Sequence, residues 1–140
     1  DFVPSRGLGD VYKRQLDTYV VDSEPYRLVD YDLLTGREQD QRCVARVAVS
    51  ENTLTIDGEG SGPIEAFVTA LGETLNEPVT IQSFQEVAIG TGSDAQAICI
   101  VSIEDREEGQ RCYGIGLSRN TTTTALNAII SAMNRRWSKS

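Results

Sequence analysis

A stripe of five apolar residues occurs twice in this 140-residue chain with identical spacing. In both copies the residues fall at positions i, i+3, i+4, i+7 and i+11, which places them along one side of an α-helix. The two stripes are Ile64, Phe67, Val68, Leu71 and Leu75, and Leu126, Ile129, Ile130, Met133 and Trp137. Because an apolar helix side has to be covered by another element, the chain must provide a covering surface for each helix.

Short segments rich in β-branched and aromatic residues precede each stripe, and they predict that both surfaces are β-sheets. Before the first helix the predicted strands are 26–34, 44–49 and 54–56; before the second they are a strand beginning at 79–81, then 95–102 and 112–117. Both faces of 95–102 are apolar, so this strand is expected to be central. The sequence therefore predicts an α+β fold made of two βββα units, about 20–78 and 79–138, that form an internal duplication with each helix packed on a small sheet.

Local signals predict where the helices begin and end. Pro63 suits a first helical turn, where its missing N–H has no intrahelical acceptor, and Asn76 and Pro78 are expected to end that helix. Asn120 is expected to cap the second helix. Residues 1–15 carry no sustained period and are expected to be a disordered or non-native tail, which leaves 16–140 as the folded domain.

Composition argues against several functional classes. The chain has no histidine, which removes Ser–His and Cys–His nucleophile pairs and the histidine-containing zinc sites. Its net charge of −8 repels phosphate backbones and anionic lipids, so we expect neither nucleic acid nor membrane as a partner. No apolar run has the roughly 18 residues of a membrane helix, and no secretion signal is visible, so the chain is predicted to be cytoplasmic.

The three cysteines, Cys43, Cys99 and Cys112, are an odd number and contain no close pair. Two of them lie in apolar alternating segments, where a thiol behaves as a small hydrophobic group. We therefore predict buried structural cysteines in preference to a disulfide or a metal site.

Two glycine-rich segments are candidates for binding. Segment 58–63 opens the first helix and could cradle an anion on free backbone amides, but it lacks the lysine of a phosphate-binding loop. Its pattern favours a tight turn that ends the third strand, with glycines chosen for positive φ and close packing; a carboxylate ligand is the alternative. Segment 90–95 favours a hairpin turn over a site. No carboxylate pair flanks an evident cleft, so general acid–base catalysis has no candidate.

Four motifs in order resemble the regulatory domain of 2-isopropylmalate synthase. They are GEGSGPIEAFV (58–68), GTGSDAQA (90–97), YGIG (113–116) and AIISAMNR (128–135), and 26–31 also fits the strand that opens that domain. The similarity covers about 20–137. It implies two βββα units, a homodimer formed through this domain, and feedback inhibition by L-leucine bound between the units near the dimer interface.

The resemblance also has consequences for catalysis. The catalytic barrel of that family is absent from the chain, so the chain alone is expected to be no enzyme but a fragment of an acyltransferase. In the full-length protein the barrel of the same polypeptide would be its partner. No cofactor and no metal are expected in this domain.

Carried across position by position, the family's leucine pocket has two parts, which we name the junction set and the wall set. The junction set, the floor, is Gly60, Ser61, Gly62, Pro63, Ile64 and Ala66. The wall set is Ile81, Phe84, Ala88, Ala95 and Ala97. Small residues would leave room for a branched side chain, the helix start could hold a carboxylate, and Asp94 is the candidate partner for the leucine ammonium group.

Two positions depart from the family pattern. Phe84 stands where many relatives carry tyrosine, and Ser118 replaces an acidic residue often found before the last helix; both changes bear on effector affinity and leave the fold unaffected.

Two other functions fit the same family pattern. One alternative is the isoleucine-sensing regulatory domain of citramalate synthase. The other is a purely structural dimerisation domain, against which the glycines and alanines at 60, 62, 95 and 97 speak, although packing could also explain them.

Overall fold

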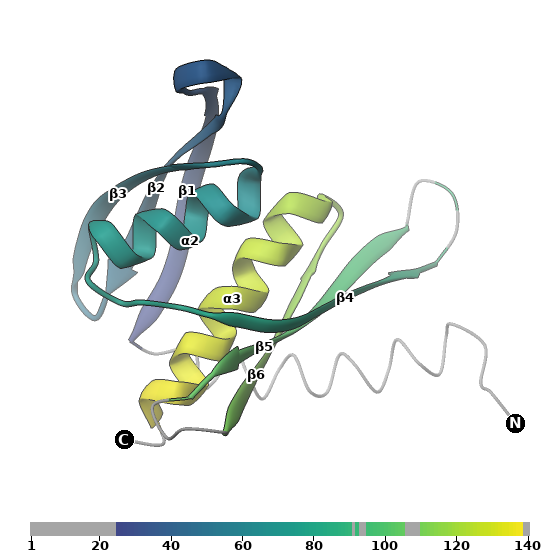
Figure 1. Cartoon of the computed structure of the whole chain (residues 1–140). Coiled ribbons are helices and arrows are strands. Elements are labelled where there is room, and N and C mark those ends of the chain that lie inside the picture. Colours follow the sequence, from purple (N-terminus) through teal and green to yellow (C-terminus); the bar gives the residue numbers. More distant parts are fainter. Residues whose placement is uncertain (1–24, 91, 93–94, 106–109, 139–140) are drawn as a thin grey trace, which may run out of the picture. The chain divides into compact units, whose positions relative to one another are not determined.

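The computed structural model describes residues 25–90, 92, 95–105 and 110–138. The chain divides near Thr80 and Ile81 into two compact units, called here the N-unit (within Glu24–Thr80) and the C-unit (within Ile81–Ser140). Each unit is a three-stranded antiparallel sheet followed by a helix (Figure 1). The predicted α+β fold of two βββα units is therefore confirmed.

In both units the middle strand is the central one, and the helix packs on the second and third strands. The N-unit contains β1 (Tyr26–Thr35), the short 3-10 helix η1 (Arg37–Gln39), β2 (Gln41–Val49), β3 (Asn52–Gly60) and α2 (Pro63–Glu73). The C-unit contains β4 (Ile81–Ile89), β5 (Gln96–Glu104), β6 (Arg111–Ser118) and α3 (Thr121–Ser138). The main contacts of α2 are with β3 and β2, and those of α3 are with β6 and β5. The prediction that 95–102 forms a central strand is thus confirmed by β5.

Pairs of glycines on β3 and β6 allow each helix to lie directly on the sheet backbone. A Cβ atom on Gly60 would lie 2.7 Å from the backbone nitrogen of Ala66, and one on Gly58 would lie 2.8 Å from the Ala66 carbonyl oxygen. On β6, a Cβ on Gly114 would lie 2.8 Å from Ala132 Cα, with a similar overlap between Gly116 and α3. Real Cβ atoms do not approach other atoms so closely. Any side chain at these four positions would therefore push the helix off the sheet.

The glycines of segment 58–62 do not end the third strand as expected, because β3 continues to Gly60. None of them has positive φ; among the described glycines that conformation occurs at Gly90 and Gly92, in the β4–β5 hairpin. The expectation of a positive-φ turn was therefore wrong, and that of close packing was right. Glycine is required at these strand positions because the backbone of α2 lies directly against them. The sequence pattern alone does not distinguish this role from a role in a turn.

The first strand of each sheet contains a β-bulge. Leu28 pairs with Val47, but Asp30 already pairs with Arg46, so β1 advances two residues while β2 advances one. In β4 the same shift falls between Ile81 and Ser83. A bulge turns the residues that follow it to the opposite face of the strand from the one simple alternation would give.

The apolar stripes carry most of the burial that their spacing predicts. Phe67 and Leu71 of α2 are buried, as are the four leading residues of the second stripe, Leu126, Ile129, Ile130 and Met133. Ile64, Val68 and Leu75 are half-buried. Trp137 is 49% exposed, so its assignment to a buried stripe was wrong; it lies in the last turn of α3.

The helix termini follow the predicted signals. Pro63 is the first residue of α2, which ends at Glu73 with Thr74 as its C-cap; Asn76, with a φ of 60°, follows two residues later. The amide of Thr123 donates to Asn120 Oδ1 at 3.0 Å, which confirms Asn120 as the cap of α3. Among the described helices none is long and apolar enough to cross a membrane.

The face of the N-unit sheet that points away from α2 is held by two ion pairs. Arg46 Nε donates to Asp30 Oδ1 at 2.7 Å, and Arg42 Nε donates to Asp57 Oδ1 at 2.9 Å. A second guanidinium nitrogen completes each pair, and these bonds lower the pKa of both aspartates. Because the pairs are exposed, their effect on stability is small.

Substitution of Gly58 by alanine tests the glycine contacts. The added methyl group must displace α2, so we expect Gly58→Ala to lower the free energy of unfolding by about 1 to 3 kcal/mol. Gly72 is the matched control, because a Cβ there meets no atom within 4 Å. In α2, Gly72→Ala should raise the stability by up to about 1 kcal/mol. Equal effects of the two substitutions in urea melts would contradict the packing role.

The three cysteines are buried, as predicted, and no disulfide joins them. Burial raises the pKa of Cys43 to about 11 and that of Cys99 to about 12. Since only the thiolate reacts, iodoacetamide at pH 8 should modify these two cysteines only after denaturation. Because the pKa of Cys43 is raised in the folded chain, its buried thiol contributes fully to the free energy of unfolding below the unfolded-state pKa near 9. This contribution decreases as the pH rises toward 11. Rapid alkylation of the folded chain would contradict this burial.

Candidate effector site

The structure divides the junction set into two groups. Gly60 and Ala66 form the contact between β3 and α2: Ala66 is fully buried, and a Cβ on Gly60 would collide with its backbone. Ser61, Gly62 and Pro63 turn the chain from strand to helix and are partly or fully exposed, and a Cβ on Gly62 would meet no atom within 4 Å. Gly60 is therefore glycine for a packing reason, whereas Gly62 borders open space.

Glu65, which was not among the predicted site residues, engages this junction. Its carboxylate accepts hydrogen bonds from the Ser61 hydroxyl at 2.5 Å and from the Ser61 amide at 3.3 Å. Both bonds lower the pKa of Glu65. Gly62 occupies the N-cap position and offers no side-chain cap, so Glu65 reaches back one residue further than in an ordinary capping box.

Few backbone amides at the start of α2 remain to donate a hydrogen bond to an anion. The Ser61 donors are occupied, Pro63 has no N–H, and the Ala66 amide donates to the Gly62 carbonyl oxygen at 2.9 Å. The amides of Ile64 and Glu65 belong to the first helical turn, where α-helix geometry supplies no intrahelical acceptor. A carboxylate at this junction would therefore be received by those two amides.

The wall set gathers on one face of the C-unit sheet. Phe84 pairs with Val101 and Ala88 pairs with Ala97, while Ile81 pairs with Ile103. Val101 is also opposite Gly114, which faces α3, so these residues all point to the α3 side. Ile81 and Phe84 are three residues apart and would face opposite sides in a regular strand; the bulge brings them to the same side. Ala95 precedes β5 by one residue and is half-buried.

The part of this face that belongs to β4 is open. Phe84 is 41% exposed and Ala88 is exposed, whereas Ala97 on the neighbouring strand is buried. The difference follows from the position of α3, whose main contacts are with β5 and β6. Asp94, the candidate ammonium partner, lies outside the described residues.

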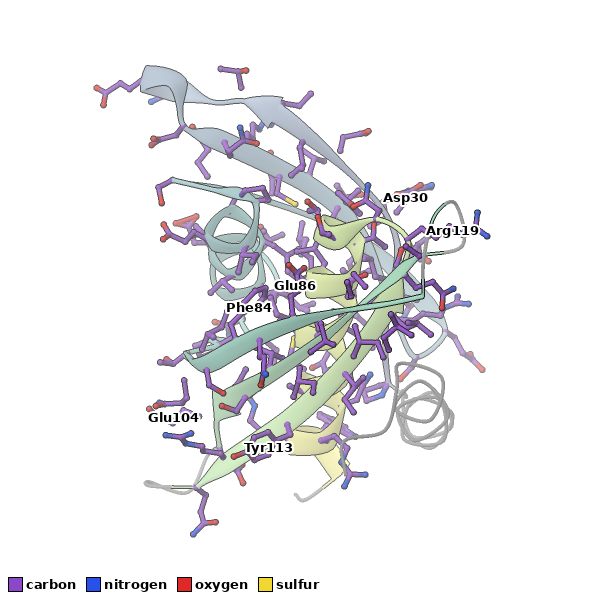
Figure 2. The ribbon with its side chains drawn as sticks, turned by 90° about the vertical axis from the view of Figure 1, so that its right-hand side faces the viewer. Asp30, Phe84, Glu86, Glu104, Tyr113 and Arg119 are labelled. Atoms are coloured by element: carbon purple, nitrogen blue, oxygen red, sulfur yellow. The ribbon has the colours of Figure 1, made fainter. Side chains whose placement is uncertain are left out.

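Glu86 is a second carboxylate that sequence reasoning missed. It pairs with Cys99 and lies between Phe84 and Ala88 on the α3 side of β4. Figure 2 labels Glu86 and Phe84 on this strand. A charged residue between two apolar ones on the same strand face was the available signal. Within the described part of the chain, no group of three or more His, Cys, Asp or Glu side chains could hold a metal ion.

Comparison with known proteins gives one consistent family. Residues 9–137 match the model of the LeuA allosteric (dimerisation) domain. The chain is 30% identical over 130 residues to a 2-isopropylmalate synthase of Clostridium acetobutylicum, covering 89% of the chain and 23% of that protein. It is 32% identical over 134 residues to that of Rhodospirillum rubrum, covering 94% and 23%, and 31% identical over 128 residues to that of Brucella suis, covering 89% and 23%.

The chain thus spans about a quarter of the length of these relatives. The match of the family model extends over both units and over all four motifs that suggested the regulatory domain. The chain therefore belongs to the LeuA allosteric (dimerisation) domain family.

Proposed function

We propose that the chain is the leucine-binding allosteric and dimerisation domain of a 2-isopropylmalate synthase, acting in feedback inhibition of leucine biosynthesis in the cytoplasm. The family match over 9–137 carries this proposal. The relatives bear the name 2-isopropylmalate synthase, and the chain corresponds to 23% of their length. The catalytic barrel would belong to the same polypeptide in the full-length protein and would be the partner that the domain regulates.

The geometry within each unit supports a branched aliphatic amino acid as effector. In the C-unit, Ile81, Phe84 and Ala88 present an apolar, partly exposed surface on one face. In the N-unit, open space at Gly62 adjoins the first amides of α2, which favour a carboxylate. We propose that the junction set and the wall set each contain effector-binding residues, and that the effector needs no metal or other cofactor in this domain.

Effector binding would reach the distant catalytic site through a coupling free energy. Such couplings are typically about 1 to 3 kcal/mol, equivalent to roughly 5- to 150-fold in affinity. By reciprocity, ligands that favour one state of the barrel would change leucine affinity by the same factor. Isoleucine, the effector expected for a citramalate synthase domain, differs from leucine by the position of one methyl group, which is worth about 1 to 3 kcal/mol in an apolar site.

Calorimetric titration of the 140-residue chain with leucine, isoleucine and valine tests the effector directly. We expect saturable heat with leucine and about tenfold or weaker affinity for the other two. Preference for isoleucine would favour the citramalate synthase alternative. Absence of binding by all three, in a chain shown to be folded by circular dichroism, would favour the purely structural dimerisation domain.

Two substitutions, one in each unit, test the proposed residues. Gly62→Val fills the open space at the junction, and its φ of −154° is a conformation that valine readily adopts. Ala88→Phe blocks the exposed wall. Each should lower leucine affinity about tenfold or more because bulk replaces space for the ligand, while the thermal midpoint changes little at these accessible positions. Unchanged affinity in both variants, with Gly72→Ala as control, would refute the assignment of the two sets.

Light scattering tests the homodimer. At micromolar concentration we expect a mass twice the 15.3 kDa of one chain. A mass of 15.3 kDa across the accessible concentration range, for a folded chain, would contradict self-association through this domain.

A further inference from the structure

Glu86 is a carboxylate placed between apolar neighbours on the proposed wall. Residues two apart on a strand share a face, so Phe84, Glu86 and Ala88 line up on the α3 side of β4. Glu86 itself is exposed. Figure 2 shows Phe84 and Glu86 next to each other along this strand.

Glu86 has no partner of the kind that several other carboxylates have. Asp30 and Asp57 are paired with arginines, Glu65 is bonded to Ser61, and Glu104 accepts a hydrogen bond from Gln82. Among the described residues Glu86 forms no hydrogen bond or ion pair. Its charge still acts locally, because it contributes to the raised pKa of Cys99 on the adjacent strand.

We propose that Glu86 binds the α-ammonium group of the effector and thereby selects amino acids over the corresponding acids without an amino group. This inference rests on the proposed function. In leucine the ammonium nitrogen lies only three bonds from Cγ, the branch point of its carbon chain. A free carboxylate flanked by Phe84 and Ala88 offers a charge-assisted acceptor beside the apolar surface that would receive that chain.

The inference predicts a ligand-dependent effect of one isosteric change. Glu86→Gln keeps the size of the side chain and removes its charge, so leucine affinity should fall about tenfold because a charge-assisted bond is lost. The probe without an ammonium group is 4-methylpentanoate, which has the carbon skeleton of leucine. Its affinity should not fall in Glu86→Gln, so the ratio of the two affinities moves toward one.

Glu51→Gln is the matched control, because Glu51 is an exposed residue of the β2–β3 turn and the change removes the same charge. It should leave both affinities unchanged. Thermal melts of all three chains establish that each is folded before titration.

The remaining outcomes each overturn the inference. Equal leucine affinity in the wild-type chain and in Glu86→Gln means that Glu86 does not contact the effector, while leaving the proposed function intact. Tighter leucine binding by Glu86→Gln means that Glu86 faces the ligand carboxylate instead. Absence of leucine binding by the folded wild-type chain removes the proposed function, and this inference with it.

Discussion

Contact between the helix backbone and glycine-bearing strands determines the architecture of both units. Gly58 and Gly60 on β3, and Gly114 and Gly116 on β6, leave no room for a side chain beneath the helix. Each helix is consequently fixed over the second and third strands of its sheet. The corresponding face of the first strand then lies beside the helix, and in the C-unit its side chains stay accessible. The exposed apolar surface of β4 is a consequence of this packing.

The duplication, the strand order and the helices could be predicted from the sequence because hydrophobic periodicity and capping residues are local signals. Asn120 and Pro63 are examples in which one residue specifies a helix start. The functions of the glycines could not be predicted in this way. A Gly-x-Gly pattern is equally typical of a turn and of a strand under a helix, and only the distance to Ala66 or Ala132 distinguishes them.

The residues of the candidate site were proposed from the sequence, but their arrangement could not be predicted from it. Alternation along β4 separates Ile81 from Phe84, and the bulge that reunites them has no sequence signal of its own. Glu65 and Glu86 were missed because an exposed glutamate usually indicates only a solvated surface. Their difference lies in their partners: Glu65 satisfies the donors of Ser61, whereas Glu86 remains available to a ligand. Asp94 stays a prediction, since it lies outside the described residues.

Recognition of leucine by both sets is the claim on which the functional interpretation depends. Amide chemical shifts of the isotopically labelled chain, followed during addition of leucine, report on each unit separately. If both sets bind leucine, the signals of Gly62 and of Ala88 both move as leucine is added, while those of Glu51 stay fixed. Movement confined to one unit, or no movement at saturating leucine, would contradict the claim.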